Sequence, residues 1–122
     1  MIAHTTLPVS DYRKAKAFYG KALEPLGYRN NMEFGDSAGF NDGKSTDFWI
    51  ARRDAVEPTH LAFEAASRSH VDAFHAAALA AGAKDNGAPG YRDYWPGCYA
   101  AFVNDPDGHN IEAVWYDYSR AK

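Results

Sequence analysis

Two stretches of the chain place apolar residues at helical spacing, in steps of three and four positions. In the first half these residues are Tyr12, Ala15, Tyr19, Ala22, Leu23 and Leu26, and in the second half they are Val71, Phe74, Ala78 and Leu79. Ser10 or Asp11 can accept a free backbone N–H at the first helix start, and Ser69 with Asp72 forms a capping-box pattern. We therefore predict helices over residues 11–25 and 69–81, each followed by a glycine.

The remaining segments have the short apolar runs and glycine turn signals of strands. Four strands are predicted in the first half, over residues 2–9, 28–34, 39–41 and 47–52. Four more are predicted in the second half, over residues 60–65, 84–86, 99–104 and 110–116. The last two flank Asp-Pro-Asp-Gly at residues 105–108, a strong turn signal. Residues 87–97 are predicted as an aromatic-rich loop, and such loops often border a site.

An internal repeat connects the two halves of the chain. At a separation of 56 positions, the matching pairs are His4 and His60, Phe18 and Phe74, Ala22 and Ala78, and Leu23 and Leu79. Each half thus begins with a strand that opens near its histidine, continues with a helix and ends with further strands. This order predicts an α+β fold of two βαβββ modules, residues 1–55 and 56–122, within one domain.

Composition and charge exclude several classes of protein. A length of 122 residues fits one domain, and 46% hydrophobic with 24% charged residues argues against disorder. The net charge of −3 excludes a generally basic nucleic-acid binder. No apolar run is long enough to span a membrane, so no membrane association is expected. The N-terminal residues lack signal-peptide features and Cys98 is the single cysteine, which together predict a cytoplasmic location.

His4, His60 and Glu112 are the residues best suited to carry chemistry. The histidines open equivalent strands, and Glu112 lies among apolar strand neighbours, where an unpaired carboxylate is costly. Each residue alone has an ordinary structural explanation: a hydrated strand face for the glutamate, hydrogen bonding for the histidines. Together, two imidazoles and one carboxylate form the facial set that binds divalent Fe, Mn, Ni, Co or Zn and leaves positions open for substrate.

Four stretches resemble the vicinal oxygen chelate superfamily, which includes glyoxalases, bleomycin resistance proteins and type I extradiol dioxygenases. They are residues 4–11 (HTTLPVSD), 17–19 (AFY), 60–63 (HLAF) and 102–112 (FVNDPDGHNIE). The resemblance covers essentially the whole chain and implies paired βαβββ modules whose U-shaped sheet cups a metal ion. It also implies His4, His60 and Glu112 as the ligands. Finally, it implies a homodimer in which His4 comes from one chain and the other two ligands from its partner.

The chain departs from glyoxalase I at one ligand position. Where that enzyme has a glutamate in the last strand of its first module, this sequence has Trp49, which weakens a lactoylglutathione lyase assignment. Trp49 is expected to face the cleft, with Phe48 and Ile50 on the opposite side of the strand. Thr6 matches a threonine of fosfomycin thiol transferases, and Tyr99 is a candidate for the active-site tyrosine of extradiol dioxygenases. Lyase or isomerase, dioxygenase and thiol-transferase chemistry all stay open.

Three further residues have weaker signals. Arg92, between Tyr91 and Tyr94, is a candidate contact for an anionic substrate group, with a surface cation–π contact as the alternative. His109 lies in the turn and is expected at the surface. Cys98 has no obvious activating partner and is expected to be inert.

The expected function is that of a metalloenzyme acting on a small oxygenated substrate, with the ion as a Lewis acid. The expected metal ligands are His4, His60 and Glu112, the expected catalytic residue is Glu112, and the expected substrate contacts are Thr6, Trp49, Arg92 and Tyr99. The alternative is a metal-free protein of the bleomycin-resistance type, which binds a small molecule in an aromatic cleft between subunits.

Overall fold

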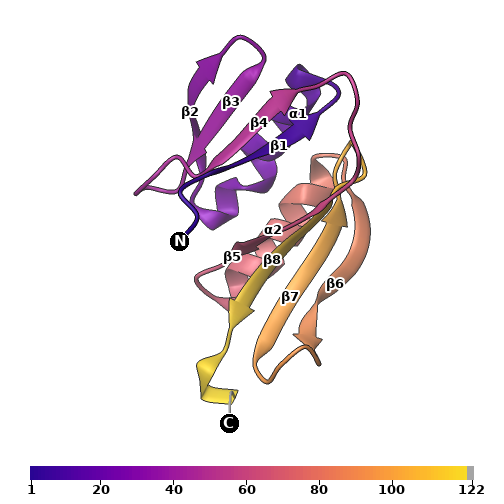
Figure 1. The fold of residues 1–122 in the computed structure, drawn as a ribbon. Coiled ribbons are helices and arrows are strands. Elements are labelled where there is room, and N and C mark those ends of the chain that lie inside the picture. The colour runs from indigo at the N-terminus through magenta and orange to yellow at the C-terminus, as the bar shows by residue number, and fades with distance from the viewer. Residues whose placement is uncertain (121–122) are drawn as a thin grey trace.

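The computed structural model describes residues 1–120 as two modules of the same element order (Figure 1). The first contains β1 (Thr5–Val9), α1 (Tyr12–Ala22), the 3-10 turn η1 (Glu24–Leu26), β2 (Arg29–Phe34), β3 (Ser37–Asn41) and β4 (Phe48–Arg52). The second contains β5 (His60–Glu64), α2 (Arg68–Ala80), β6 (Lys84–Arg92), β7 (Cys98–Asn104), β8 (Asn110–Tyr116) and the 3-10 turn η2 (Tyr118–Arg120). The predicted α+β fold of two βαβββ modules is confirmed.

Each module forms a mixed sheet of four strands. The strand orders are β1-β4-β3-β2 and β5-β8-β7-β6, so the first strand of each module lies at an edge. In both sheets this strand pairs in parallel with the last strand, and the other pairings are antiparallel. The identical topology is what a duplicated module requires, and it places His60 directly beside Asn110.

The two helices begin at side-chain caps. Of the two predicted cap candidates, Ser10 and Asp11, Asp11 caps α1 by accepting the N–H of Lys14 at 3.1 Å. In α2 the predicted capping box at Ser69 is wrong, because Ser67 is the extended residue that accepts the N–H of His70. No helix among residues 1–120 is long and apolar enough to cross a membrane.

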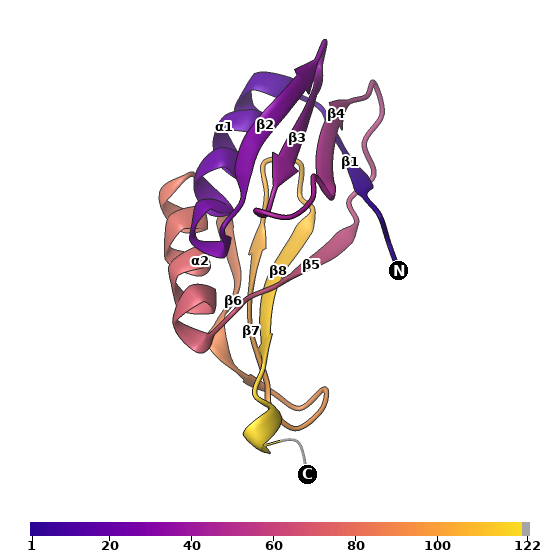
Figure 2. The same cartoon turned by 90° about the vertical axis from the view of Figure 1, so that its left-hand side faces the viewer.

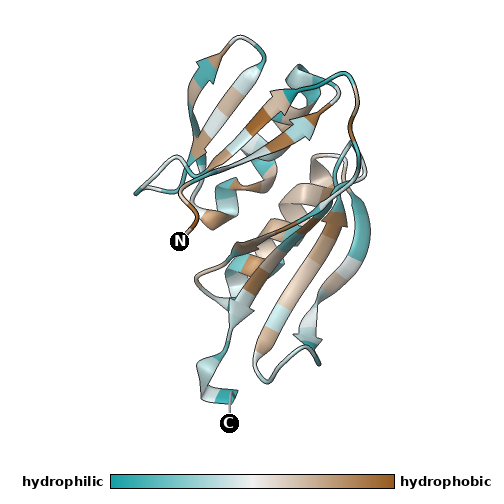
Figure 3. Cartoon of the chain, viewed as in Figure 1, coloured by the Kyte–Doolittle hydropathy of each residue, from teal (hydrophilic) through white to brown (hydrophobic). Residues whose placement is uncertain are grey.

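Both helices pack on the same side of the molecule and leave the other face of each sheet uncovered (Figure 2). Alternate strand residues face the helices and form one core that continues across both modules. Phe48 of β4 and Phe63 of β5 meet edge to face at 5.0 Å between ring centres, which joins the modules directly. Along the strands, apolar residues are concentrated in the inner strands β4 and β7, and hydrophilic residues lie along the edge strand β6 (Figure 3).

His109 corrects a sequence prediction, since it is fully buried instead of lying at the surface. Its Nδ1 accepts the N–H of Thr59 at 3.0 Å, and its Nε2–H donates to the carbonyl of Pro8 at 2.7 Å. Asp105, in the same turn, accepts the hydroxyl of Tyr19 from α1. The turn therefore lies at the junction of the modules, with Asp105 and His109 buried there and Pro106 and Gly108 exposed to solvent.

Strand β6 corrects the predicted loop over residues 87–97. The strand continues to Arg92, with irregular pairing to β7 around Gly87 and Gly90. Glycine and proline in this segment concealed the strand, because both residues weaken an ordinary strand pattern. Only residues 93–97 form the turn to β7.

Candidate functional site

The uncovered face of the second sheet gathers several of the chemically active side chains. Residues Phe63, Ala101 and Ala113 face α2 and the core, so the alternate positions face away from the helix. The residues on this uncovered face include His60, Glu64, Arg92, Cys98, Ala100, Phe102, Glu112, Val114 and Tyr116. We call it the second-sheet face.

His60 and Glu112 form the polar centre of the second-sheet face. His60 Nε2 lies 3.0 Å from Glu112 Oε1. His60 Nδ1 lies 3.0 Å from the carbonyl oxygen of Asn110. Because a carbonyl only accepts, Nδ1 carries a proton and Nε2 is the nitrogen that faces Glu112. The backbone of β8 thus fixes both the tautomer and the direction of the imidazole. Without a metal ion, the contact between Nε2 and Oε1 needs one proton between them, since two lone pairs would repel; a bound cation takes the place of that proton.

Glu112 has an environment that disfavours its charge. Its side chain is only 11% exposed, whereas that of His60 is 50% exposed. Burial raises the pKa of Glu112, and the neighbouring His60 and then Arg92 act in the opposite direction without cancelling it. A buried carboxylate of this kind is stabilised by any cation that replaces its lost hydration.

His4 lies apart from this pair within the chain. It is exposed, precedes β1 by one residue and lines a hollow of about 490 Å³ with Asp47, Leu61 and Glu64. Within residues 1–120, no three ligand-type side chains come close enough to hold one metal ion. One chain therefore supplies the pair from β5 and β8, and the contribution of His4 stays a prediction about a second copy.

Trp49 lies on the opposite face of β4 from the buried Phe48 and Ile50, as the strand alternation predicted. Its ring lies across Gly39, where an added Cβ would come within 2.9 Å of two indole carbons. Phe34 stacks on it at 6.1 Å between ring centres and is itself 63% exposed. Thr6 is the strand partner of Trp49 on β1. The uncovered face of the first sheet is therefore aromatic.

Tyr99 does not belong to the second-sheet face. Its hydroxyl donates to Asp72 of α2 at 2.6 Å, and the guanidinium of Arg68 lies over its ring at 5.3 Å. Tyr99 is the strand partner of Trp115, and the side chains of both residues lie on the opposite face of the sheet from Glu112. The expectation that Tyr99 contacts substrate beside Glu112 does not fit this position, and the residue instead connects α2 to the sheet.

Phe102 is the residue of the second-sheet face that the sequence reasoning missed. It is the strand partner of Glu112, and the ring of His60 lies parallel to it at 6.3 Å between centres. Tyr94 meets its edge at 6.5 Å. The signal was present in the turn at residues 105–108, because the hairpin register places Phe102 beside Glu112. Cys98 is buried, and burial raises the pKa of its thiol, in keeping with an inert role.

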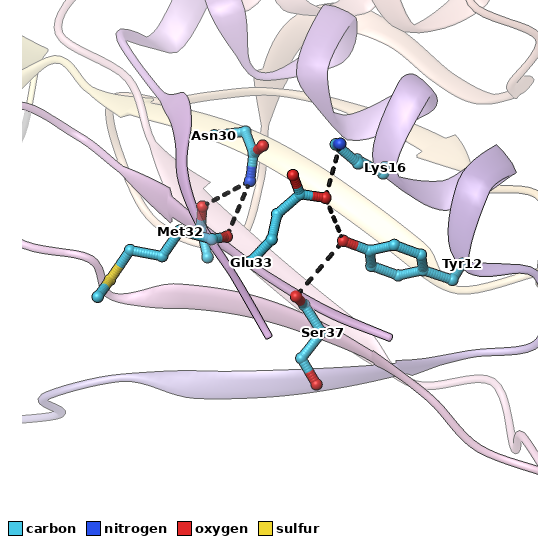
Figure 4. Close-up of polar contacts among 7 residues, drawn as sticks. Tyr12, Lys16, Asn30, Met32, Glu33 and Ser37 are labelled. Atoms are coloured by element: carbon cyan, nitrogen blue, oxygen red, sulfur yellow. Dashed lines mark hydrogen bonds and ion pairs between the residues drawn. The ribbon is translucent and has the colours of Figure 1, made fainter. Parts of the chain in front are cut away.

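A second hollow, of about 620 Å³, lies between α1 and β2 and contains none of the predicted ligands. Figure 4 shows its polar groups bound to one another. Glu33 accepts the hydroxyl of Tyr12 at 2.6 Å and pairs with Lys16 at 2.6 Å. Burial, and then Glu33, raise the pKa of Tyr12 to about 12. In this groove, Tyr12, Lys16 and Glu33 bind one another.

Comparison with known proteins agrees with this architecture. The family model of the glyoxalase/bleomycin resistance protein/dioxygenase superfamily matches residues 1–113, and the chain belongs to this superfamily. The uncharacterized protein YqjT of Bacillus subtilis is 30% identical, covering 91% of this chain and 95% of that protein.

Two solved structures show the likeness in three dimensions. A glyoxalase/bleomycin resistance protein from Albidiferax ferrireducens T118 is 30% identical, with a TM-score of 0.80 over 93% of this chain and 96% of that one. A lactoylglutathione lyase from Agrobacterium tumefaciens is 21% identical, with a TM-score of 0.71 over 94% of this chain and 92% of that one. The latter likeness concerns the fold alone.

Proposed function

We propose that this protein is a divalent-metal-dependent enzyme that acts on a small oxygenated substrate. The observation that carries the proposal is the pair of His60 and Glu112 on the second-sheet face, where Nε2 lies 3.0 Å from an oxygen of a poorly hydrated carboxylate and Nδ1 is held by a backbone carbonyl. His4 from a second copy of the chain completes the ligand set. The enzyme is therefore proposed to be a homodimer.

The donor pair fits a divalent ion. Two ligands at about 2.1 Å from one ion, and at right angles about it, lie about 3.0 Å apart. The observed separation of Nε2 and Oε1 is 3.0 Å. The backbone contact at Nδ1 is the outer-shell hydrogen bond that metal-binding histidines usually make. The donor types suit Fe, Mn, Ni, Co or Zn.

A bound ion supplies Lewis acidity toward a substrate oxygen. The residues of the chain provide the rest of the site. Glu112 provides the negative charge, the carbonyl of Asn110 holds the imidazole of His60 in place, and Phe102 gives the second-sheet face an apolar floor. In a homodimer, the aromatic face around Trp49 is proposed to line the same cleft and limit access of water.

A second candidate function is metal-free binding of a small molecule. The exposed stack of Phe34 on Trp49 favours it, because aromatic side chains exposed on a sheet face bind planar or apolar ligands well. The two candidates differ in their dependence on metal, so one titration separates them.

The decisive experiment is calorimetric titration of metal-stripped protein with Fe(II), Mn(II), Co(II), Ni(II) and Zn(II). At least one ion is expected to bind at micromolar concentration or tighter. Glu112→Gln is expected to weaken that binding by about 100-fold or more, because it removes the only carboxylate ligand. The matched control Glu24→Gln changes an exposed glutamate of η1, outside the second-sheet face, and is expected to leave binding unchanged. Equal affinity of parent and Glu112→Gln for every ion contradicts the metal proposal.

A further inference from the structure

Arg92 ends strand β6, and backbone carbonyls hold its guanidinium against that strand. Nη1–H donates to the carbonyl of Gly90 at 2.9 Å, and Nη2–H donates to the carbonyl of Ala88 at 2.7 Å. These contacts are local to the strand whose pairing with β7 is irregular at Gly87 and Gly90. A guanidinium fixed in this way has lost most of its rotamer freedom before any ligand arrives.

The two glycines leave the space that the guanidinium occupies. A Cβ on Gly90 would lie 3.1 Å from Nη1, and a Cβ on Gly87 would lie 3.2 Å from Nη2 and 3.0 Å from the ring of Phe102. A methyl group at either position would force the guanidinium to shift by a few tenths of an ångström, and a larger side chain would crowd it further. The irregular, glycine-containing strand is thus shaped around one arginine.

The guanidinium lies on the second-sheet face with the proposed metal ligands. Its central carbon is 5.4 Å from the ring centre of Phe102, which is the strand partner of Glu112. The positive charge of Arg92 attracts the carboxylate of Glu112 and acts to lower its pKa. Arg92 and the His60–Glu112 pair therefore border the same space above Phe102.

Arg92 keeps donors available for a ligand. A guanidinium has five N–H groups, and the two backbone carbonyls use two of them. Among residues 1–120, no carboxylate lies within ion-pair distance of Arg92. The remaining three N–H groups suffice for a bidentate contact with a planar carboxylate.

We propose that Arg92 binds a carboxylate of the substrate and so selects oxygenated substrates that carry one. This inference rests on the proposed function, because it places the substrate between Arg92 and the His60–Glu112 pair. Arg92 is then a specificity-determining residue, and the metal ligands make the contacts to the reacting oxygens.

The test compares three probes that share the same pair of adjacent oxygens. Catechol carries no carboxylate, whereas 2,3-dihydroxybenzoate and 3,4-dihydroxybenzoate carry one at two different positions. The dissociation constants are measured by calorimetry, on protein loaded with the tightest-binding ion and on stripped protein. At least one of the two acids is expected to bind parent protein at least about 10-fold more tightly than catechol, as one charged bidentate contact provides.

Arg92→Met is expected to abolish this preference, which is the ratio of the affinities for acid and catechol measured on the same variant and so does not depend on an equal change in both affinities. Gly90→Val keeps the arginine but fills its place, and is expected to reduce the preference as well. Arg68→Met is the matched control, since Arg68 makes the same kind of contact with Tyr99 on the helix-covered side of the sheet. Thermal unfolding confirms that each variant is folded.

The outcomes separate this inference from the proposed function. If the parent binds metal but shows no preference for either acid, or if Arg92→Met keeps the preference, the carboxylate inference is wrong and the metal site stands. If stripped protein binds no metal but still prefers an acid through Arg92, the arginine site stands and the metal proposal fails.

Discussion

At the scale of single residues, Glu112 is a buried carboxylate whose charge lowers the stability of the folded state. A glutamine of the same shape would avoid the cost of a buried charge, and strand β8 is otherwise apolar at its buried positions. The carboxylate is retained at a cost that a bound cation would offset. That cost is measurable when no metal is present.

In chelator, we expect the stability of the parent to decrease relative to Glu112→Gln as pH rises. Burial raises the pKa of folded Glu112 above its ordinary value of 4.5, so the folded state holds the proton more tightly than the unfolded state. The difference is absent below about pH 4.5, grows as pH rises to the raised pKa and is constant above it. Unfolding midpoints from pH 4 to pH 8 measure it.

Adding the metal ion at pH 7 is expected to reverse the order, because only the parent then gains binding energy. A parent that equals or exceeds Glu112→Gln in chelator at every pH would show that burial imposes no net penalty on this carboxylate.

At the scale of elements, strand β3 is adapted to the side chain of its neighbour β4. Gly39 is the strand partner of Trp49, and an added Cβ would lie 2.7 Å from the methyl group of Thr46 and 2.9 Å from the indole. The glycine is needed for space, since its φ is not in the positive range. The indole position on the uncovered face is thus set from two strands.

Gly39→Ala is expected to destabilise the protein by about 1–3 kcal/mol and to shift the tryptophan emission, because the indole must move. Gly20→Ala is the control: it lies in α1 with no atom near the added methyl group, so a gain of about 0.5–1 kcal/mol is expected. Chemical denaturation followed by fluorescence measures both. An unchanged spectrum and stability in Gly39→Ala would mean that the Trp49 ring is not held as described.

Several elements were predictable because their signals are local. The helical stripes and the cap at Ser10 or Asp11 lie within short stretches of sequence, and the module repeat appears when two such stretches are compared. The position of Tyr99 was also within reach, since the turn at residues 105–108 fixes the register that pairs it with Trp115. Burial of His109 was not, because its partners Pro8 and Thr59 are distant in sequence.

In the candidate site, too, some features were predictable from the sequence and others depend on contacts that the sequence pattern does not reveal. Pairing of His60 with Glu112 follows from the repeat and from the parallel contact of first and last strands. The anchoring of Arg92 depends on an irregular strand that its glycines and proline concealed. The place of His4 depends on assembly, which no pattern within one chain determines.

At the scale of the whole molecule, the proposed site requires two chains. If His4 comes from one chain and Glu112 from its partner, mixing the His4→Ala and Glu112→Ala proteins regenerates intact sites. After unfolding and refolding together, about a quarter of the sites are expected to recover, because half of random dimers are mixed and each mixed dimer has one intact site. Metal bound per chain measures the recovery.

Neither variant refolded alone should bind metal, and sedimentation should show a dimer in every sample. Absence of recovery in a verified mixed dimer would show that the ligands come from one chain, contrary to the proposed assembly.

The buried imidazole of His109 has a consequence for how the chain folds. Its hydrogen bond to Thr59 lies within the second module, whereas its hydrogen bond to Pro8 crosses to the first module and forms only when both modules are in place. The shared aromatic contact between Phe48 and Phe63 adds to this dependence. We therefore expect the two modules to unfold together in one cooperative transition, because a module separated from the other would lose the core contacts that cross the junction.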